Sequence, residues 1–316
     1  MRRAGSAVAG FLILHIAQAG GQTPEFRSEI RLVVLHATVT NSQGESITNL
    51  SQRAFKVREN GKRQTITLFR RDDVPISLGL LIDNSGSMRL LRSKVEAAAL
   101  AFARASNPDD EVFVLNFADK VHLDVPMTSD LRALEAGIGR VDSIGGTAMR
   151  DAVDVAERYL TEHARRDRRV LLVITDGKDN ASVTSAARIR EQAERSQTAI
   201  DAIGLFNERD SAAAGTGRHE LLEMTQRSGG IAYFPANVEQ VESAAVDLAR
   251  QIRNQYTIAY APLNQALDGS YRAIEVTVDG AERYTVHTRA GYRAVPAARS
   301  APTGAGPAGP PATYPK

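Results

Sequence analysis

Between residues 76 and 253, short apolar runs alternate with amphipathic segments along the chain. The runs LGLLI, VFVLNF and VLLVIT are almost continuously apolar, which is typical of strands covered on both faces of a sheet. Expected strands are Ile76–Asp83, Glu111–Phe117, Val170–Thr175, Thr198–Leu205 and Ile231–Phe234, with a short edge strand at Val121–Val125. Expected helices are Ser87–Ala105, Asp130–Gly139, Ala148–His163, Val183–Ser196, Arg218–Ser228 and Val238–Asn254. This alternation predicts an α/β fold, with a doubly wound, mostly parallel sheet flanked by helices.

Both flanks of this region have the pattern of β-strands. Expected strands before it are Ile30–Thr40, Ala54–Glu59 and Gln64–Phe69, and those after it are Tyr256–Tyr260, Tyr271–Val278 and Arg283–Arg289. The dipeptides Asn60-Gly61 and Asp279-Gly280 favour tight turns, so each is expected to join its neighbouring strands as an antiparallel hairpin. Neither flank has a full core of its own. We therefore expect residues 25–73 and 255–294 to pack on each other as a small β module beside the α/β domain of residues 74–254.

The N-terminus has the pattern of a secretory signal peptide. Two arginines precede a mostly apolar stretch from Ala7 to Ala17, and Ala17-Gln18-Ala19 is an A-x-A cleavage site. We expect residues 1–19 to be removed on export, which places the protein in the periplasm or outside the cell with no stable membrane span. An uncleaved anchor helix is the weaker alternative, because the apolar stretch is shorter than the ~20 residues that a span needs. Residues 295–316 are rich in Ala, Pro and Gly, which predicts a disordered tail.

Composition narrows the classes of function. The 316-residue chain has no cysteine, which excludes disulfides, thiolate metal sites and cysteine nucleophiles. Removing residues 1–19 takes away two arginines and no acidic residue, so 37 of the 39 basic residues then balance 37 acidic ones. Without a net positive charge, no nucleic acid is expected as a partner.

Candidate chemistry begins where an apolar run ends at Asp83. The string DNSGSM starts there and places Ser85 and Ser87 at alternate positions after the aspartate. A carboxylate and two hydroxyls are hard oxygen ligands of the kind that Mg²⁺ takes. Two later loops offer similar groups, with Thr147 before an expected helix and Asp176 after an expected strand. Because doubly wound folds bind ligands at the carboxyl ends of their strands, we expect these three loops to converge on one cation.

Together, the motifs DNSGSM, GGT and ITDG resemble the metal-ion-dependent adhesion site of the von Willebrand factor type A family, over roughly residues 74–254. The flanking segments VRENGKRQTITLF, YTIAYAP and TRAGYRA more loosely resemble bacterial secreted proteins related to that family. The resemblance implies a Rossmann-like fold and a complete metal site made of Asp83, Ser85, Ser87, Thr147 and Asp176. The hydroxyls would coordinate the ion, and the aspartates would do so directly or through water. Mg²⁺ is the implied ion, and Mn²⁺ and Ca²⁺ are also compatible.

The resemblance further implies an exported, adhesion-type protein-binding module and not an enzyme. A divalent cation with few negative charges on it stays electrophilic, so it would capture a Glu or Asp carboxylate of a partner protein. Helix capping is the other explanation for Ser85, Ser87 and Thr147. For Asp179 and Asn180, just after the third motif, loop solvation is the favoured interpretation.

Other functions remain open at this stage. A structural or assembly protein would use the metal only to stabilise the loops, and its β segments would make the contacts. A hydrolase would need Ser85 or Ser87 as a nucleophile, but the G-x-S-x-G elbow is absent and no motif places a histidine as base. The family also contains cytoplasmic domains that work with AAA+ ATPases, a role that the signal peptide argues against.

Overall fold

The computed structural model describes residues 31–71, 73–139, 144–206, 211–280 and 283–296. The expected signal peptide and all but the first two residues of the expected C-terminal tail lie outside these ranges. Within the described ranges, no helix combines the length and the apolar character needed to cross a membrane.

A six-stranded sheet forms the centre of the α/β region, in the order β10-β9-β8-β5-β6-β7. Its strands are β5 (Ser77–Asp83), β6 (Glu111–Phe117), β7 (Val121–Thr128), β8 (Arg169–Thr175), β9 (Ala199–Gly204) and β10 (Ala232–Tyr233). Neighbouring strands are parallel except β7, which runs antiparallel to β6 at one edge. The mostly parallel sheet and the edge strand expected from the sequence are thus confirmed.

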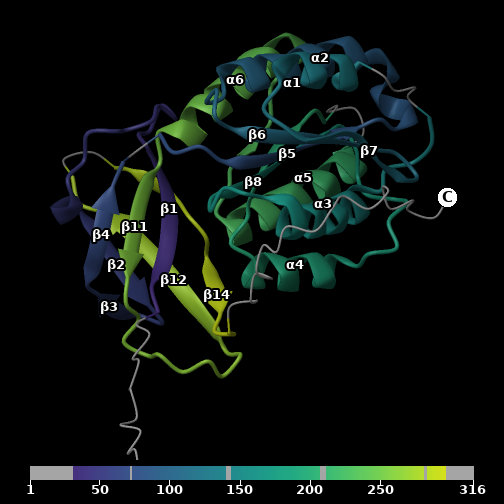
Figure 1. The fold of residues 1–316 in the computed structure, drawn as a ribbon. Helices are drawn as coiled ribbons and strands as arrows, with labels where there is room; N and C mark the ends of the chain where they lie inside the picture. Colours follow the sequence, from purple (N-terminus) through teal and green to yellow (C-terminus); the bar gives the residue numbers. More distant parts are fainter. Residues whose placement is uncertain (1–30, 72, 140–143, 207–210, 281–282, 297–316) are drawn as a thin grey trace, which may run out of the picture. The chain divides into compact units, whose positions relative to one another are not determined.

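Six α-helices cover the two faces of this sheet. They are α1 (Arg92–Ala105), α2 (Leu131–Ile138), α3 (Met149–His163), α4 (Ala186–Arg195), α5 (Ser211–Ser228) and α6 (Val241–Arg253). In Figure 1, α1, α2 and α6 lie on one side of β5, β6 and β8, and α3, α4 and α5 lie on the other. This is the doubly wound arrangement expected from the sequence.

Several helix ends differ from the expected ones. The helix expected from Ser87 is a 3₁₀ helix, Gly86–Leu90, followed by α1. The start expected at Val183 was wrong: α4 begins at Ala186, because the Ser185 side chain accepts a hydrogen bond from Arg188 N and caps the helix there. Helix α5 begins seven residues earlier than expected, at Ser211.

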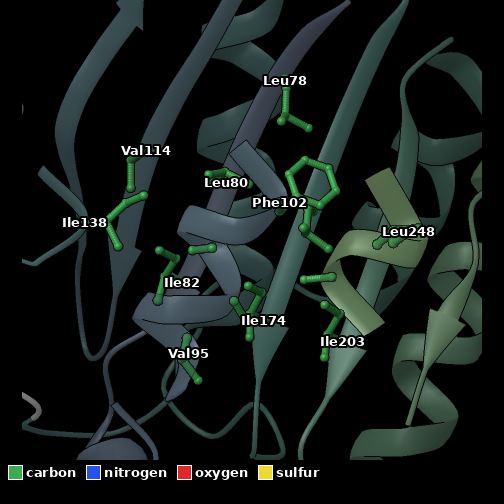
Figure 2. Packing of buried hydrophobic residues seen from close by; sticks show 14 of the residues in the cluster. Leu78, Leu80, Ile82, Val95, Phe102, Val114, Ile138, Ile174, Ile203 and Leu248 are labelled. Atoms are coloured by element: carbon green, nitrogen blue, oxygen red, sulfur yellow. The ribbon is translucent and has the colours of Figure 1, made fainter. Parts of the chain in front are cut away.

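Side chains along β5 alternate between two apolar clusters, because successive residues of a strand point to opposite faces. Leu78, Leu80 and Ile82 lie in the cluster that contains Phe102 of α1 (Figure 2). Leu81 lies in the other cluster, with residues of α3. Since both faces are covered, all seven residues of β5 are buried, and its sequence has no polar alternation.

The flanking segments pair into two four-stranded sheets that share one apolar cluster. The orders are β13-β1-β11-β4 and β14-β12-β2-β3. The strands are β1 (Val33–Thr40), β2 (Phe55–Glu59), β3 (Lys62–Gln64), β4 (Ile66–Arg70), β11 (Tyr256–Tyr260), β12 (Tyr271–Val278), β13 (Thr285–His287) and β14 (Gly291–Arg293). Both sheets combine strands from the two flanks, with β1 antiparallel to β11 and β2 antiparallel to β12. We call these two sheets the β module.

Pairing within the β module corrects two of the expected hairpins. Asn60-Gly61 does join β2 to β3, but the segment expected to continue this hairpin to Phe69 leaves the sheet after Gln64. Residues 66–70 instead form β4, which pairs with β11. The expected hairpin around Asp279-Gly280 was wrong, since β12 pairs with β2 and β14 while β13 pairs with β1. A turn signal predicts a change of direction, whereas the pairing partner is decided by burial against distant strands.

Buried polar contacts join the β module to the α/β region. The guanidinium of Arg168 donates to Gln255 Oε1, and Gln255 Nε2 donates to Thr38 Oγ1 at 3.0 Å. All three residues are buried. Elsewhere, Glu194 of α4 accepts hydrogen bonds from Arg293 of β14, with Nε at 2.9 Å from Oε2, and from Arg227 of α5. These contacts tie both flanking segments to the helices and strands of the α/β region.

Glu157 of α3 makes the stability of the fold depend on pH. Its side chain is buried, and Oε2 accepts hydrogen bonds from Ser196 Oγ at 3.0 Å and Thr198 Oγ1 at 3.1 Å. Burial raises the pKa of Glu157 from 4.5 to about 7, although the two hydroxyls and the Arg169 charge act in the opposite direction. Because the folded state holds this proton more tightly than the unfolded state, the free energy of unfolding falls as the pH rises through this window. The loss amounts to about 3 kcal/mol at most.

We expect Glu157→Gln to remove this part of the pH dependence, because glutamine cannot ionise. The measurement is urea-induced unfolding at about pH 5 and about pH 8, where the wild type loses stability at the higher pH. Asp201, whose pKa burial also raises to about 7, leaves a residual slope in the variant. If the variant lost as much stability between the two pH values as the wild type does, Glu157 would not be the source.

Candidate metal centre

Three loops meet at the carboxyl edge of the central sheet, where parallel strands of this fold class place ligands. The first follows β5 and contains the 3₁₀ helix Gly86–Leu90, the second is residues 144–148 before α3, and the third is residues 176–185 after β8. Backbone hydrogen bonds join the first two loops. Gly86 N donates to Gly145 O at 3.0 Å, and Ile144 N donates to Asn84 O at 3.1 Å.

Two serine hydroxyls and a carboxylate join the first loop to the third. Ser85 Oγ lies 3.0 Å from Ser87 Oγ, and Ser87 Oγ donates to Asp176 Oδ1 at 2.8 Å. Ser85 is buried and Ser87 is exposed, so the group is open to solvent at Ser87. The structure therefore brings together three of the five residues that the sequence indicated.

Thr147 lies beside this group, on the second loop. Its side chain is buried, and its backbone N–H donates to Asn180 Oδ1 at 2.8 Å. A Cβ added to Gly177 would lie 3.3 Å from Thr147 Oγ1, so the threonine hydroxyl faces the residue that follows Asp176. The third hydroxyl thus lies next to the loop that carries Asp176.

Asp83 is as deeply buried as Ser85, with an exposed fraction of 2%. Its Oδ1 accepts a hydrogen bond from Ser85 N at 2.8 Å, and its Oδ2 accepts one from Thr175 Oγ1 at 2.5 Å. Thr175 is the last residue of β8 and was not singled out in the sequence. Asp83 therefore fixes the start of the first loop against the end of the neighbouring strand.

Burial raises the pKa of both aspartates. That of Asp83 rises to about 6, although hydrogen bonds from Thr175 and Ser85 lower it. The pKa of Asp176 is also raised by burial, and the hydrogen bond from Ser87 opposes the shift. Two carboxylates that are costly to ionise without a counter-charge suit a site for a cation, which would stabilise their charged forms.

Loop solvation, the interpretation favoured for Asp179 and Asn180, was wrong for Asp179. The Asp179 side chain is fully buried and accepts hydrogen bonds from Arg150 N at 2.7 Å, Arg150 Nη2 at 2.9 Å and Ser182 Oγ at 2.6 Å. Asn180 is exposed, but its Oδ1 holds the Thr147 backbone. Asp179 thus fastens the third loop to the first turn of α3, and Asn180 fastens it to Thr147 on the second loop.

Asp119 also holds the second loop, and the sequence reading missed it. Its Oδ1 accepts a hydrogen bond from Gly146 N at 2.7 Å. Gly145 has a φ of +92°, and a Cβ there would lie 2.3 Å from Asp119 Oδ2, so only glycine fits. Asp119 stands two residues after β6, and its position at the carboxyl end of an expected strand was the available signal.

The donor set fits a hard divalent cation. In an octahedral Mg²⁺ site with metal–oxygen distances of about 2.1 Å, neighbouring ligand oxygens lie about 3 Å apart. The distances from Ser87 Oγ to Ser85 Oγ and to Asp176 Oδ1, 3.0 and 2.8 Å, have this spacing. The described part of the chain contains no group of three or more His, Cys, Asp or Glu side chains that could hold a metal ion, and this site has two carboxylates with its hydroxyls.

The serines lack the partners of a nucleophile. Within the described residues, neither Ser85 Oγ nor Ser87 Oγ is hydrogen-bonded to a histidine. The two hydroxyls instead contact each other, and that of Ser87 also contacts the Asp176 carboxylate. The serine–histidine pair of a typical serine nucleophile is therefore not seen at these two residues.

Comparison with known proteins gives one sequence match and several structural ones. No curated protein matches the sequence significantly. A von Willebrand factor type A protein from Catenulispora acidiphila is 14% identical and has a TM-score of 0.49, with 85% of this chain and 75% of that chain covered. Proximal thread matrix protein 1 from the mussel byssus, with a zinc-occupied MIDAS motif, is 17% identical at a TM-score of 0.49, over 62% and 50% of the two chains. An aerotolerance-related membrane protein from Bacteroides fragilis is 17% identical at a TM-score of 0.45, over 56% and 99%.

The sequence match covers the region that carries all five candidate residues. It begins within β5 and ends two residues after Asp176, so it includes the three loops described above. Residues 78–178 of this chain match the von Willebrand factor type A domain.

Proposed function

We propose that the chain binds Mg²⁺ with Ser85, Ser87, Thr147, Asp176 and Asp83. The observation that carries this proposal is the spacing of Ser87 Oγ from Ser85 Oγ and from Asp176 Oδ1, at 3.0 and 2.8 Å. The hydroxyls and Asp176 are suited to direct contact with the ion. Both Asp83 oxygens already accept hydrogen bonds from the protein, which favours contact through water.

The bound ion would serve to capture a carboxylate of a partner protein. Von Willebrand factor type A domains generally mediate protein interactions or adhesion. Three of the five residues are neutral, so the ion keeps positive charge and a coordination position for an outside oxygen. Binding is favoured over catalysis because, within the described residues, neither serine hydroxyl is hydrogen-bonded to a histidine base. The signal-peptide pattern of residues 1–19 supports an extracytoplasmic setting for this role.

We expect Ser87→Ala to weaken Mg²⁺ binding by at least about tenfold, because it removes one oxygen ligand from a site of few charges. Isothermal titration calorimetry of the full chain with Mg²⁺ measures the effect. Ser93→Ala is the matched control, since Ser93 is an exposed serine on α1, six residues further along the chain. Equal affinities of Ser87→Ala and wild type would contradict the proposed ligand set.

Capture of the partner is tested with immobilised full-length chain and a native extract. Proteins retained by the wild type in Mg²⁺ should be lost with a chelator, and they should also be lost from Asp83→Ala. If the same proteins remained bound under both treatments, the contacts would lie elsewhere, and the role as an assembly protein would be favoured.

A further inference from the structure

We propose that Leu90, Ile144 and Val183 form an apolar rim around the metal centre, and that this rim selects partners in which the captured carboxylate stands between large apolar side chains. The inference rests on the proposed function, and it adds the chemistry of the partner segment. We call these three residues the apolar rim.

The rim residues are unusually exposed for their type. The exposed fractions are 94% for Val183, 91% for Leu90 and 67% for Ile144. Among the exposed large hydrophobic residues in the described part of the chain, Val183 and Leu90 have the highest fractions. Single exposed apolar side chains are common on protein surfaces, but these three occupy the three loops of one site.

Each rim residue stands a few positions from a proposed ligand. Leu90 ends the 3₁₀ helix that contains Ser87, and Ile144 precedes Thr147 by three residues. Val183 follows Asp176 on the third loop. The three exposed side chains therefore belong to the three loops that carry the proposed ligands.

Hydrogen bonds fix the backbone at two of these positions. Ile144 N donates to Asn84 O at 3.1 Å, which holds it against the first loop. Val183 N donates to Asp151 Oδ2 at 3.0 Å, and the preceding residue is held by Asp179. The apolar side chains are thus presented on an ordered backbone, which reduces the entropy lost when a partner binds.

The rim has a physical role in capturing a carboxylate. A metal–carboxylate contact is stronger where water is excluded, because the effective dielectric constant falls. Apolar side chains that close around such a contact exclude water in the manner of the ring around an interface hot spot. The exposed cations Arg89 and Lys178 on the same loops add attraction for an acidic segment. Apolar residues on both sides of the carboxylate would fill the rim.

The experiment uses a displayed peptide library with a fixed glutamate between random residues, selected on the full-length chain in Mg²⁺. We expect the selected peptides to be enriched in Leu, Ile, Val and Phe beside the glutamate. Their binding should require Mg²⁺ and should be lost when the glutamate is replaced by glutamine.

The variant that tests the rim carries Leu90→Ser, Ile144→Ser and Val183→Ser together. We expect it to bind the best selected peptide at least about tenfold more weakly, because interface residues of this kind commonly contribute more than 1 kcal/mol. Its Mg²⁺ affinity should stay unchanged. Leu263→Ser is the matched control, since Leu263 is 72% exposed but lies in the β module, between β11 and β12. It should bind the peptide as the wild type does.

The outcomes separate this inference from the function on which it rests. The apolar rim is contradicted if the selected glutamate peptides bind in a metal-dependent way but lack apolar neighbours. It is also contradicted if the triple variant binds the peptide as the wild type does. Either outcome leaves the proposed function standing. Selection that is independent of Mg²⁺ and of the glutamate overturns the proposed function itself.

Discussion

Asp179→Ala is expected to destabilise the fold by about 3 kcal/mol and to weaken Mg²⁺ binding by at least about tenfold. The substitution leaves the partly buried Arg150 guanidinium without this carboxylate, and it frees the Arg150 and Ser182 backbones that Asp179 now holds. The third loop then loses part of its attachment to α3, where the bonds from Val183 N and Thr184 N to Asp151 remain. The positions of Thr147 and Asp176 relative to each other are then less firmly held. Chemical denaturation and calorimetric Mg²⁺ titration measure the two effects.

Asp167→Ala is the control for Asp179→Ala, because Asp167 is an exposed aspartate in the loop before β8. It should change neither quantity measurably. Asp179→Asn keeps the shape and loses the charge, so its effect should be intermediate. A normal Mg²⁺ affinity in a destabilised Asp179→Ala protein would show that the loop keeps its shape without this carboxylate.

Gly79→Ala is expected to cost about 2–3 kcal/mol of stability, although it adds a single methyl group. Gly79 lies in the middle of β5, and a Cβ there would lie 2.4 Å from Phe113 Cζ and 2.6 Å from Leu171 Cδ2. Phe113 is fully buried and contacts the Tyr159 ring at a centroid distance of 4.6 Å, so it has little room to move. The shift of β5 that would relieve the overlap would also displace Asp83 at its end. Thermal and chemical unfolding measure the loss.

Gly139→Ala is the matched control for Gly79→Ala. Its φ of −85° suits alanine, and an added Cβ would meet no atom within 4 Å. It should leave stability unchanged or raise it slightly. Combining Gly79→Ala with Phe113→Leu should cost less than the sum of the two single changes, because the smaller side chain makes room for the methyl group. Strict additivity would contradict the proposed overlap.

The α/β region was predictable because its signals are local. A strand buried on both faces shows as a continuous apolar run, as in β5 and β8, and parallel strands then bring their carboxyl ends together. That rule is sufficient to group Asp83, Ser85, Ser87 and Asp176 from the sequence. In the structure, Ser87 lies within hydrogen-bond distance of Ser85 and of Asp176.

The strand partners in the β module were less predictable. The turn at Asp279-Gly280 indicated a hairpin, but β13 pairs with β1, about 250 residues earlier in the chain. Alternating apolar residues predict a strand and its buried face, but they do not predict which strand pairs with it. Only the packing of both flanks around one cluster decides this.

The supporting residues of the metal centre were missed for another reason. Asp179 and Asn180 have the composition of an exposed loop, and only their contacts with Arg150 and Thr147 show that they hold the third loop against α3 and the second loop. Such contacts join residues about 30 positions apart and leave no periodic pattern. Sequence patterns indicated the proposed ligands, whereas the residues that position them became evident only in the structure.

The strands of the β module come from both ends of the described chain, so they are synthesised at different times during translation. Strand β1 leaves the ribosome more than 200 residues before β11, its neighbour in the finished sheet. The segment after β1 also depends on β11, because Leu50 N donates a hydrogen bond to the Tyr256 hydroxyl. By then every strand of the central sheet has already been synthesised. Folding of that sheet brings the ends of β4 and β11 together, where Arg70 pairs with Thr257. Folding of the α/β region therefore brings together the strands on either side of it. A nascent chain stalled before residue 256 would present β1 and β4 as unpaired strands with aggregation-prone edges.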